Sequence, residues 1–183
     1  MYLCRHGQSQ YNAQGKLQGQ LDNPLTALGE EQALLLACRA KKWNISTVIS
    51  SPLARAQQTA NICAQALNLP VAVQSAFEER CYGAWQGSPI SQLHSFKQFK
   101  QNCYLQPDCV PCHGAESTAT VRNRMTNQLK ILSQQHINGN VLLISHGDAI
   151  DCLLSMYTTA KILANCQHLR FVKVADHFVW DNS

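Results

Sequence analysis

Asn140-Val141-Leu142-Leu143-Ile144, followed by Ser145-His146-Gly147, is the most strand-like stretch of the chain. A short apolar run bounded by polar residues and glycine is typical of a strand that is buried on both faces of a sheet. Segments with the pattern of helices flank it, at 117–135 and 148–157. Strands that alternate with helices in this way are typical of a parallel sheet covered by helices on both faces.

The same alternation continues outward along the chain. Further strands are predicted at 2–4, 47–50, 69–73 and 168–174. Further helices are predicted from the cap at Thr26 to about Trp43, from Pro52 in a first turn to Leu67, and around 90–100. We therefore expect an α/β fold, a three-layer αβα sandwich with a mostly parallel central sheet and its active site at the carboxyl ends of the strands.

The length and composition are those of one folded unit. The chain has 183 residues, of which 45% are apolar, so it can bury a core and is not expected to be disordered. It contains no internal repeat, low-complexity tract or linker rich in proline and glycine. We expect a single domain over residues 1–183.

Charge and cysteine content narrow the classes of partner. No apolar run reaches the ~18 residues of a membrane span, and the first residues do not resemble a signal peptide, so we expect a cytoplasmic protein without a membrane partner. The net charge of +4 suits a small anionic ligand and is too scattered for nucleic acid. The nine cysteines are an odd number spread along the chain, and we expect most to be reduced core residues. The oligomeric state cannot be predicted.

Histidines and arginines follow three of the predicted strands. Arg5-His6-Gly7 follows the first, Ser51-Pro52-Leu53-Ala54-Arg55 the second, and His146-Gly147 the stretch quoted above. The carboxyl ends of parallel strands meet at one edge of a sheet, where ligands bind. Guanidinium groups match phosphate oxygens, a neutral imidazole can act as a nucleophile, and glycine lets backbone N–H groups approach an anion. The pattern predicts an anion site that contains a nucleophile.

Six short motifs, spread over nearly the whole chain, resemble those of one known family. They are LCRHGQSQYN at 3–12, PLTALG at 24–29, SSPLARAQQTA at 50–60, FEERCYG at 77–83, GAES at 114–117 and ISHG at 144–147. In this order they resemble the histidine phosphatase superfamily, also called phosphoglycerate mutase-like. The resemblance implies an enzyme that transfers a phosphoryl group through a phosphohistidine.

The resemblance also implies a role for each matching residue. His6 would attack the substrate phosphorus and carry the phosphoryl group. The groups implied to surround the phosphoryl oxygens are Arg5, Arg55, His146, the amides of Asn12 and Gln18, and the backbone N–H of Gly147. The family's proton donor is the glutamate that ends a Leu-x-Glu motif, which falls on Glu79, with Phe77 in the place of the leucine. Glu78 is adjacent and stays open as an alternative.

These roles set requirements that the residues can meet. His6 must be unprotonated to attack, and neighbouring arginines oppose a positive charge on its ring. Its other ring nitrogen is expected to donate to a backbone carbonyl. Glu79 must hold a proton near neutral pH, through partial burial or the nearby phosphate. No metal ion or other cofactor is expected, since the arginines supply the positive field.

Hydrolysis is the predicted outcome, with phosphoglycerate mutase-type transfer as the alternative. Mutases of the family carry extra basic residues in the insert after the acid, whereas the short insert at about 85–113 offers only Lys97 and Lys100. Gln18 also resembles the phosphatase pattern. The insert is expected to form the rim of the pocket, where aromatic residues line the pocket or belong to the core. The expected partner is a small phosphomonoester such as a sugar phosphate, a phosphoglycerate or α-ribazole phosphate.

Three rival interpretations remain. Cys109-Val110-Pro111-Cys112-His113 has the spacing of a c-type haem attachment site, although nothing at the N-terminus directs export. Cys103, Cys109, Cys112 and His113 offer ligand types that suit zinc. A third possibility is a binding module that senses a phosphorylated ligand without turnover, which the complete set of catalytic residue types disfavours.

Overall fold

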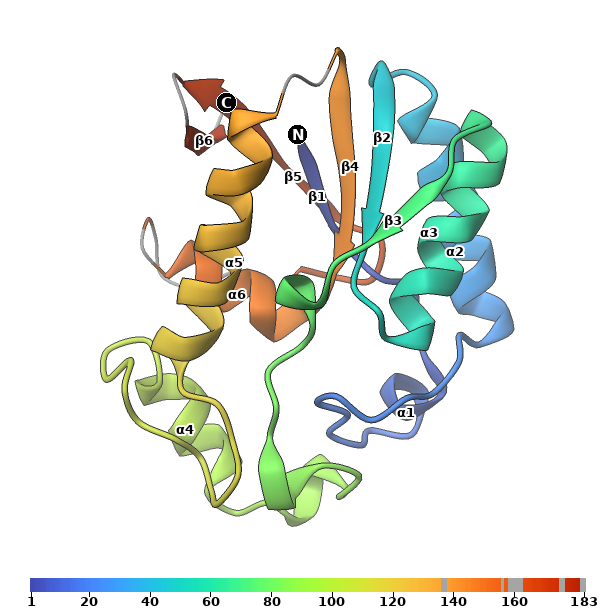
Figure 1. Ribbon diagram of the computed structural model, residues 1–183. Coiled ribbons are helices and arrows are strands. Elements are labelled where there is room, and N and C mark those ends of the chain that lie inside the picture. Colours follow the sequence, from blue (N-terminus) through green and yellow to red (C-terminus); the bar gives the residue numbers. More distant parts are fainter. Residues whose placement is uncertain (136–137, 156, 158–162, 175–176, 182–183) are drawn as a thin grey trace.

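The computed structural model describes residues 1–135, 138–155, 157, 163–174 and 177–181 (Figure 1). Its strands form one sheet in the order β3-β2-β4-β1-β5-β6. The strands are β1 (Tyr2–Arg5), β2 (Ile45–Ser50), β3 (Val71–Val73), β4 (Asn140–Ser145), β5 (His168–Val174) and β6 (His177–Asp181). The pairs β3–β2, β2–β4 and β4–β1 are parallel, while β5 is antiparallel to both β1 and β6. The prediction of a mostly parallel sheet is confirmed.

Helices cover both faces of this sheet. The α-helices are α1 (Gln10–Ala13), α2 (Ala27–Ala40), α3 (Ala54–Leu67), α4 (Phe96–Asn102), α5 (Thr118–Gln134) and α6 (Gly147–Leu154). Single 3-10 turns are η1 (Ser75–Phe77), η2 (Gly83–Trp85) and η3 (Ile90–Gln92). In Figure 1, α2 and α3 lie on one side of the sheet and α5 and α6 on the other, which confirms the three-layer αβα architecture. The short helices α1 and α4 lie beyond the carboxyl ends of the parallel strands.

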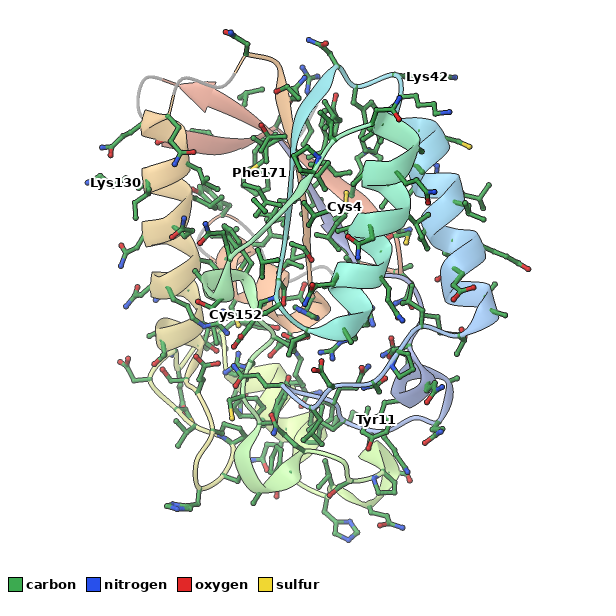
Figure 2. The ribbon with its side chains drawn as sticks, turned by 45° about the vertical axis from the view of Figure 1, so that its right-hand side comes forward. Cys4, Tyr11, Lys42, Lys130, Cys152 and Phe171 are labelled. Atoms are coloured by element: carbon green, nitrogen blue, oxygen red, sulfur yellow. The ribbon has the colours of Figure 1, made fainter. Side chains whose placement is uncertain are left out.

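The core follows from the alternation of side chains along the central strands. Leu3 and Leu143 belong to the cluster with α5 and α6, whereas Cys4 and Leu142 belong to the cluster with α2 and α3. Successive residues of a strand point to opposite faces, so one short apolar run fills both layers. In Figure 2, Cys4 and Phe171 lie in the interior of the molecule, while the lysines labelled there project outward.

Two helix caps match their predictions. The Thr26 hydroxyl accepts a hydrogen bond from the Gly29 N–H at the start of α2, and the Ser117 hydroxyl accepts one from the Thr120 N–H at the start of α5. Each cap satisfies a backbone N–H that has no partner inside its own helix. The helix expected to reach Trp43 ends at Ala40.

Four other boundaries differ from the predictions. Pro52 lies outside α3, because the Ser51 hydroxyl accepts a hydrogen bond from the Leu53 N–H and holds a turn before Ala54. The helix expected around 90–100 is two pieces, η3 and α4, because Leu93 leaves helical backbone angles between them. The strand expected from Leu69 starts at Val71, and α6 ends at Leu154 rather than at 157. The antiparallel strand β6 was not predicted.

Close packing of two glycines positions the loop after β1. A Cβ atom on Gly7 would lie 2.4 Å from the Gly29 carbonyl oxygen, and one on Gly29 would lie 2.1 Å from the Gln8 carbonyl oxygen. Neither contact leaves room for a side chain. The backbone after His6 therefore lies directly on the start of α2. None of the helices in the described ranges is long and apolar enough to span a membrane.

Candidate active site

A cavity of about 550 Å³ opens at the carboxyl ends of β1 and β4. Seven of the predicted site residues line it, namely Arg5, His6, Asn12, Gln18, Arg55, Glu79 and Gly147. The eighth, His146, lies behind this wall, with its ring centroid 5.1 Å from that of His6. The structure therefore brings together residues from five separate segments of the chain.

His6 has the geometry of a nucleophile. Its Nδ1 lies 2.6 Å from the Gly7 carbonyl oxygen, which can only accept, so Nδ1 carries the proton and Nε2 is unprotonated. Arg55 Nε donates to that Nε2 at 3.3 Å. Burial, and then the charges of Arg55 and Arg5, hold the pKa of His6 well below its usual value. The imidazole is therefore neutral at neutral pH, and its unprotonated nitrogen lies beside a guanidinium group.

His146 is the second buried imidazole. Its Nε2 forms a 2.8 Å hydrogen bond with the Ser51 hydroxyl, and its Nδ1 has no hydrogen-bond partner among the described residues. Burial, followed by the charges of Arg55 and neighbouring groups, holds its pKa well below the usual value for histidine. Ser51, which sequence reasoning did not single out, therefore orients the ring next to His6.

Arg55 and Arg5 supply the positive field. Arg55 is almost wholly buried and is held by the carbonyl oxygens of Gly19, at 2.8 Å, and Leu21, at 3.0 Å. Burial lowers its pKa to about 10, which leaves it charged at neutral pH. Arg5 donates to the Leu163 carbonyl oxygen at 2.6 Å, and its buried Nε has no partner in the described part of the chain.

Among the described residues no carboxylate pairs directly with either charge, and Glu79 acts on both only at longer range. Every contact described above for Arg55 and Arg5 is to a carbonyl oxygen or an imidazole, and neither residue forms an ion pair among the described residues. A buried positive charge without a counter-ion is costly, and an anion that enters the cavity offsets that cost. The geometry therefore favours a phosphoryl group bound between the guanidinium groups.

Glu79 lines the cavity, whereas Glu78 does not. Glu79 Oε1 accepts hydrogen bonds from the backbone N–H groups of Arg80 and Ala149. Its Oε2 accepts one from the backbone N–H of Asp148. Burial, and then the negative charge of Asp148, raise the pKa of Glu79 against the opposing effect of these hydrogen bonds. The carboxyl group is thus held at the first turn of α6 with a pKa shifted toward proton donation.

The two amides and the glycine lie where donors are needed. Asn12 Oδ1 accepts from the Ser9 N–H, and Gln18 Oε1 accepts from Ser9 Oγ and from Asn23 Nδ2. With their oxygens so occupied, the NH2 groups of both amides are the ends that can donate to a ligand. Gly147 is the first residue of α6 and also lines the cavity.

Sequence reasoning missed an ion-pair network on the other wall. Asp148 accepts hydrogen bonds from Arg80 Nε at 2.6 Å and from the Tyr82 hydroxyl at 2.7 Å, and it also pairs with Lys100 and contacts the Tyr104 hydroxyl. The positive charges of Lys100 and Arg80 hold the pKa of Asp148 below its usual value despite burial. The available signal was the presence of acidic residues in the otherwise apolar run 147–154.

The insert contributes the outer wall. Ile90, Phe96, Lys97 and Tyr104 line the cavity, whereas Phe99 is buried in a small separate cluster that includes Tyr82. Phe96 and Tyr104 also pack against this cluster, so they combine the two expected roles, whereas Phe99 has the core role alone.

The cysteines of the insert do not form a metal site. Cys103 is buried in the small cluster, Cys109 is exposed, and the Cys112 thiol donates to the Tyr82 carbonyl oxygen at 3.0 Å. No group of three or more His, Cys, Asp or Glu side chains within the described ranges could hold a metal ion. The zinc alternative is contradicted, because its four candidate ligands do not come together.

Comparison with known proteins agrees with the motifs. The family model of the histidine phosphatase superfamily (branch 1) matches residues 1–171. The chain belongs to this superfamily. A probable phosphoglycerate mutase GpmB of Yersinia enterocolitica is 36% identical over 156 residues, which are 85% of this chain and 73% of that protein. The uncharacterized phosphatase PhoE of Bacillus subtilis is 34% identical over 153 residues, which are 84% and 74% of the two chains.

Solved structures of other histidine phosphatase folds resemble this one throughout. A phosphoserine phosphatase from Entamoeba histolytica, in complex with 3-phosphoglyceric acid, has a TM-score of 0.83 and 28% identity, covering 98% of this chain and 93% of that one. A mycobacterial glucosyl-3-phosphoglycerate phosphatase, complexed with VO3, has a TM-score of 0.86 and 25% identity, covering 99% and 96%. This member of the histidine phosphatase superfamily therefore has relatives named for hydrolysis and relatives named for mutase activity.

Proposed function

We propose that the protein is a phosphomonoesterase that hydrolyses a small phosphorylated metabolite through a phosphohistidine on His6, without a metal ion. The observation that carries the proposal is the tautomer of His6, whose Nδ1 donates to the Gly7 carbonyl oxygen and leaves Nε2 unprotonated. Two guanidinium groups that form no ion pair among the described residues lie beside it. Relatives named as phosphatases support the choice of reaction class.

Each step of the reaction uses groups already in position. His6 Nε2 attacks the phosphorus, the ester P–O bond breaks, and Glu79 gives its proton to the leaving oxygen. Glu79, now ionised, takes a proton from a water molecule that attacks the phosphorus. The P–N bond then breaks and inorganic phosphate leaves. Arg5 and Arg55 stabilise the charge on the phosphoryl oxygens in both transition states.

The mutase alternative is favoured by the relatives named as probable phosphoglycerate mutases. A mutase must hold a second anionic group and keep water out while the phosphoryl group returns to the same molecule. Of the two lysines in the insert, Lys100 is paired with Asp148, which leaves Lys97 there, while Lys16 also lines the cavity. The insert itself thus supplies little positive charge for a second anionic group, which supports hydrolysis.

A substrate panel with a chelator tests the proposal. The purified chain is incubated in EDTA with p-nitrophenyl phosphate, 3-phosphoglycerate, phosphoserine and a sugar phosphate, and both inorganic phosphate and 2-phosphoglycerate are measured. We expect phosphate release that EDTA does not inhibit, and slower interconversion of phosphoglycerates. Faster interconversion than release would establish the mutase alternative. If no substrate is turned over at any pH, the remaining interpretation is a module that binds a phosphorylated ligand without turnover.

The role of Glu79 gives a sharper prediction. Because an amide cannot donate the required proton, Glu79→Gln is expected to lower kcat for alkyl phosphates by about 100- to 10,000-fold. The loss should be much smaller for p-nitrophenyl phosphate, whose leaving group needs little protonation. Steady-state kinetics with both substrates measure the difference.

Glu78→Gln is the matched control for this experiment. It makes the same change on the adjacent residue, which does not line the cavity. We expect its kinetics to equal those of the unmodified chain. A large loss in Glu78→Gln with Glu79→Gln unaffected would show that Glu78 is the acid.

A further inference from the structure

Asp151 is a buried carboxylic acid for which the reaction above has no use. It follows Gly147 by one turn of α6 and lines the same cavity. Only 2% of the residue is exposed, and its Oδ1 has no hydrogen-bond partner in the part of the chain that the structure describes. A buried polar atom without a partner is costly and rare in folded proteins. A ligand group that donates to Oδ1 would remove this cost.

One lysine of the cavity acts on Asp151 but is paired with another carboxylate. Lys100 pairs with Asp148, which also accepts hydrogen bonds from Arg80 and the Tyr82 hydroxyl. Burial, together with the negative charges of Asp148 and Glu79, raises the pKa of Asp151 to about 7, against the opposing effects of Lys100 and Arg5. The ionised form of Asp151 is thus stabilised less by Lys100 and Arg5 than it is destabilised by burial and the neighbouring carboxylates, and a cation or donor that enters the cavity would stabilise it further.

Asp151 shares its cavity with residues of both ends of the site. Arg5 and His6 line it where the phosphoryl group is expected, and Phe96 and Tyr104 line it on the side of the insert. A leaving group attached to the phosphoryl oxygen must extend from the first pair toward the second. Asp151 is therefore a side chain of the cavity that such a leaving group can meet.

We propose that Asp151 binds a protonated amine on the leaving group of the substrate, so that amino-bearing phosphomonoesters are the preferred substrate class. This inference rests on the proposed phosphatase function for the identity of the phosphoryl end. A carboxylate and an ammonium group form a charge-assisted hydrogen bond, which is stronger than a neutral one. A hydroxyl at the same place would satisfy Oδ1 without the charge.

Three ligands with the same skeleton separate these contributions. O-phosphoserine, 3-phosphoglycerate and 3-phosphooxypropionate carry an amino group, a hydroxyl and a hydrogen, respectively, on the same carbon. Their dissociation constants are measured by calorimetry on His6→Ala, which removes the nucleophile and prevents turnover. The same titrations are repeated with Asp151→Asn, and separately Asp151→Ala, added to His6→Ala. Asp108→Asn, which changes an exposed acid of the insert that does not line the cavity, is the matched control.

We expect the amino ligand to bind at least about tenfold tighter than the hydrogen analogue, with the hydroxyl ligand between them. Asp151→Asn is expected to reduce the amino preference to about twofold or less, while Asp108→Asn keeps it. Asparagine is nearly isosteric with aspartate, so thermal unfolding should show no loss of stability. Equal binding of the amino and hydrogen ligands, tighter binding of the hydroxyl ligand, an amino preference that survives both Asp151 variants, or no binding at all would overturn the proposal.

Turnover by the unmodified chain distinguishes the two levels of inference. An amino preference in binding without phosphate release from any substrate would overturn the proposed function and leave the role of Asp151 intact. Phosphate release without an amino preference in binding would support the proposed function and overturn the role of Asp151.

Discussion

Replacing His6 by alanine is expected to leave a folded protein whose turnover of phosphomonoesters is lower by at least about 1,000-fold, on the order of 4 kcal/mol of transition-state stabilisation. The imidazole Nε2 is the only atom in the proposed reaction that bonds to phosphorus from the protein side. Its lone pair is available because Nδ1 donates to the Gly7 carbonyl oxygen. Alanine offers no atom that could replace it.

A trapping experiment identifies the intermediate. Phosphohistidine survives alkali, so quenching the unmodified chain in base during turnover of labelled substrate should leave label on the protein, and His6→Ala should carry none. His94→Ala removes an exposed histidine of the insert and serves as the control that keeps both activity and label. Continued consumption of substrate without label on the unmodified chain would contradict the phosphohistidine mechanism.

Arg80→Met is expected to lower the free energy of unfolding by about 3–5 kcal/mol, a large fraction of the 5–15 kcal/mol typical of a folded protein. Arg80 is fully buried and donates to Asp148 at 2.6 Å, to the Glu116 carbonyl oxygen at 3.0 Å and to the Thr118 hydroxyl at 2.9 Å. Methionine keeps much of the side-chain volume but leaves Asp148 buried with fewer partners. Chemical denaturation monitored by circular dichroism measures the change.

An exposed ion pair provides the comparison. Arg170 pairs with Asp181 at 3.3 Å, and 58% of the Arg170 side chain is exposed. Because water solvates the Arg170 guanidinium group, Arg170→Met is expected to change stability by no more than about 1 kcal/mol. A loss in Arg80→Met as small as that in Arg170→Met would show that the buried network contributes little to folding.

Local patterns were enough for the architecture and for much of the cavity. The run from Val141 to Ile144 predicted a central strand because burial on both faces requires consecutive apolar residues. Thr26 and Ser117 predicted two helix starts because a hydroxyl can satisfy a free N–H nearby in sequence. His6 and Arg55 were predicted to meet because parallel strands end at one edge.

Contacts between distant segments were needed for the remaining details. Glu78 and Glu79 are adjacent residues with the same side chain. Only the packing of their segment against α6 brings Glu79 to the cavity. Asp148 pairs with Lys100 and Arg80, which lie 48 and 68 positions away along the chain. No pattern of neighbouring residues could therefore predict these ion pairs. The proposed role of Asp151 has the same origin.

Periodicity, capping residues and motif order can be read from residues that are neighbours in the sequence. They predict the alternation of strands and helices, and from it the edge of the sheet at which the anion site lies. Burial and charge compensation are properties of the assembled layers. They decide that the imidazole of His6 is neutral and that the carboxyl groups of Asp148 and Asp151, one turn apart on α6, have pKa values shifted in opposite directions. The two aspartates differ because, among the described residues, only Asp148 forms direct ion pairs with cations from other parts of the chain.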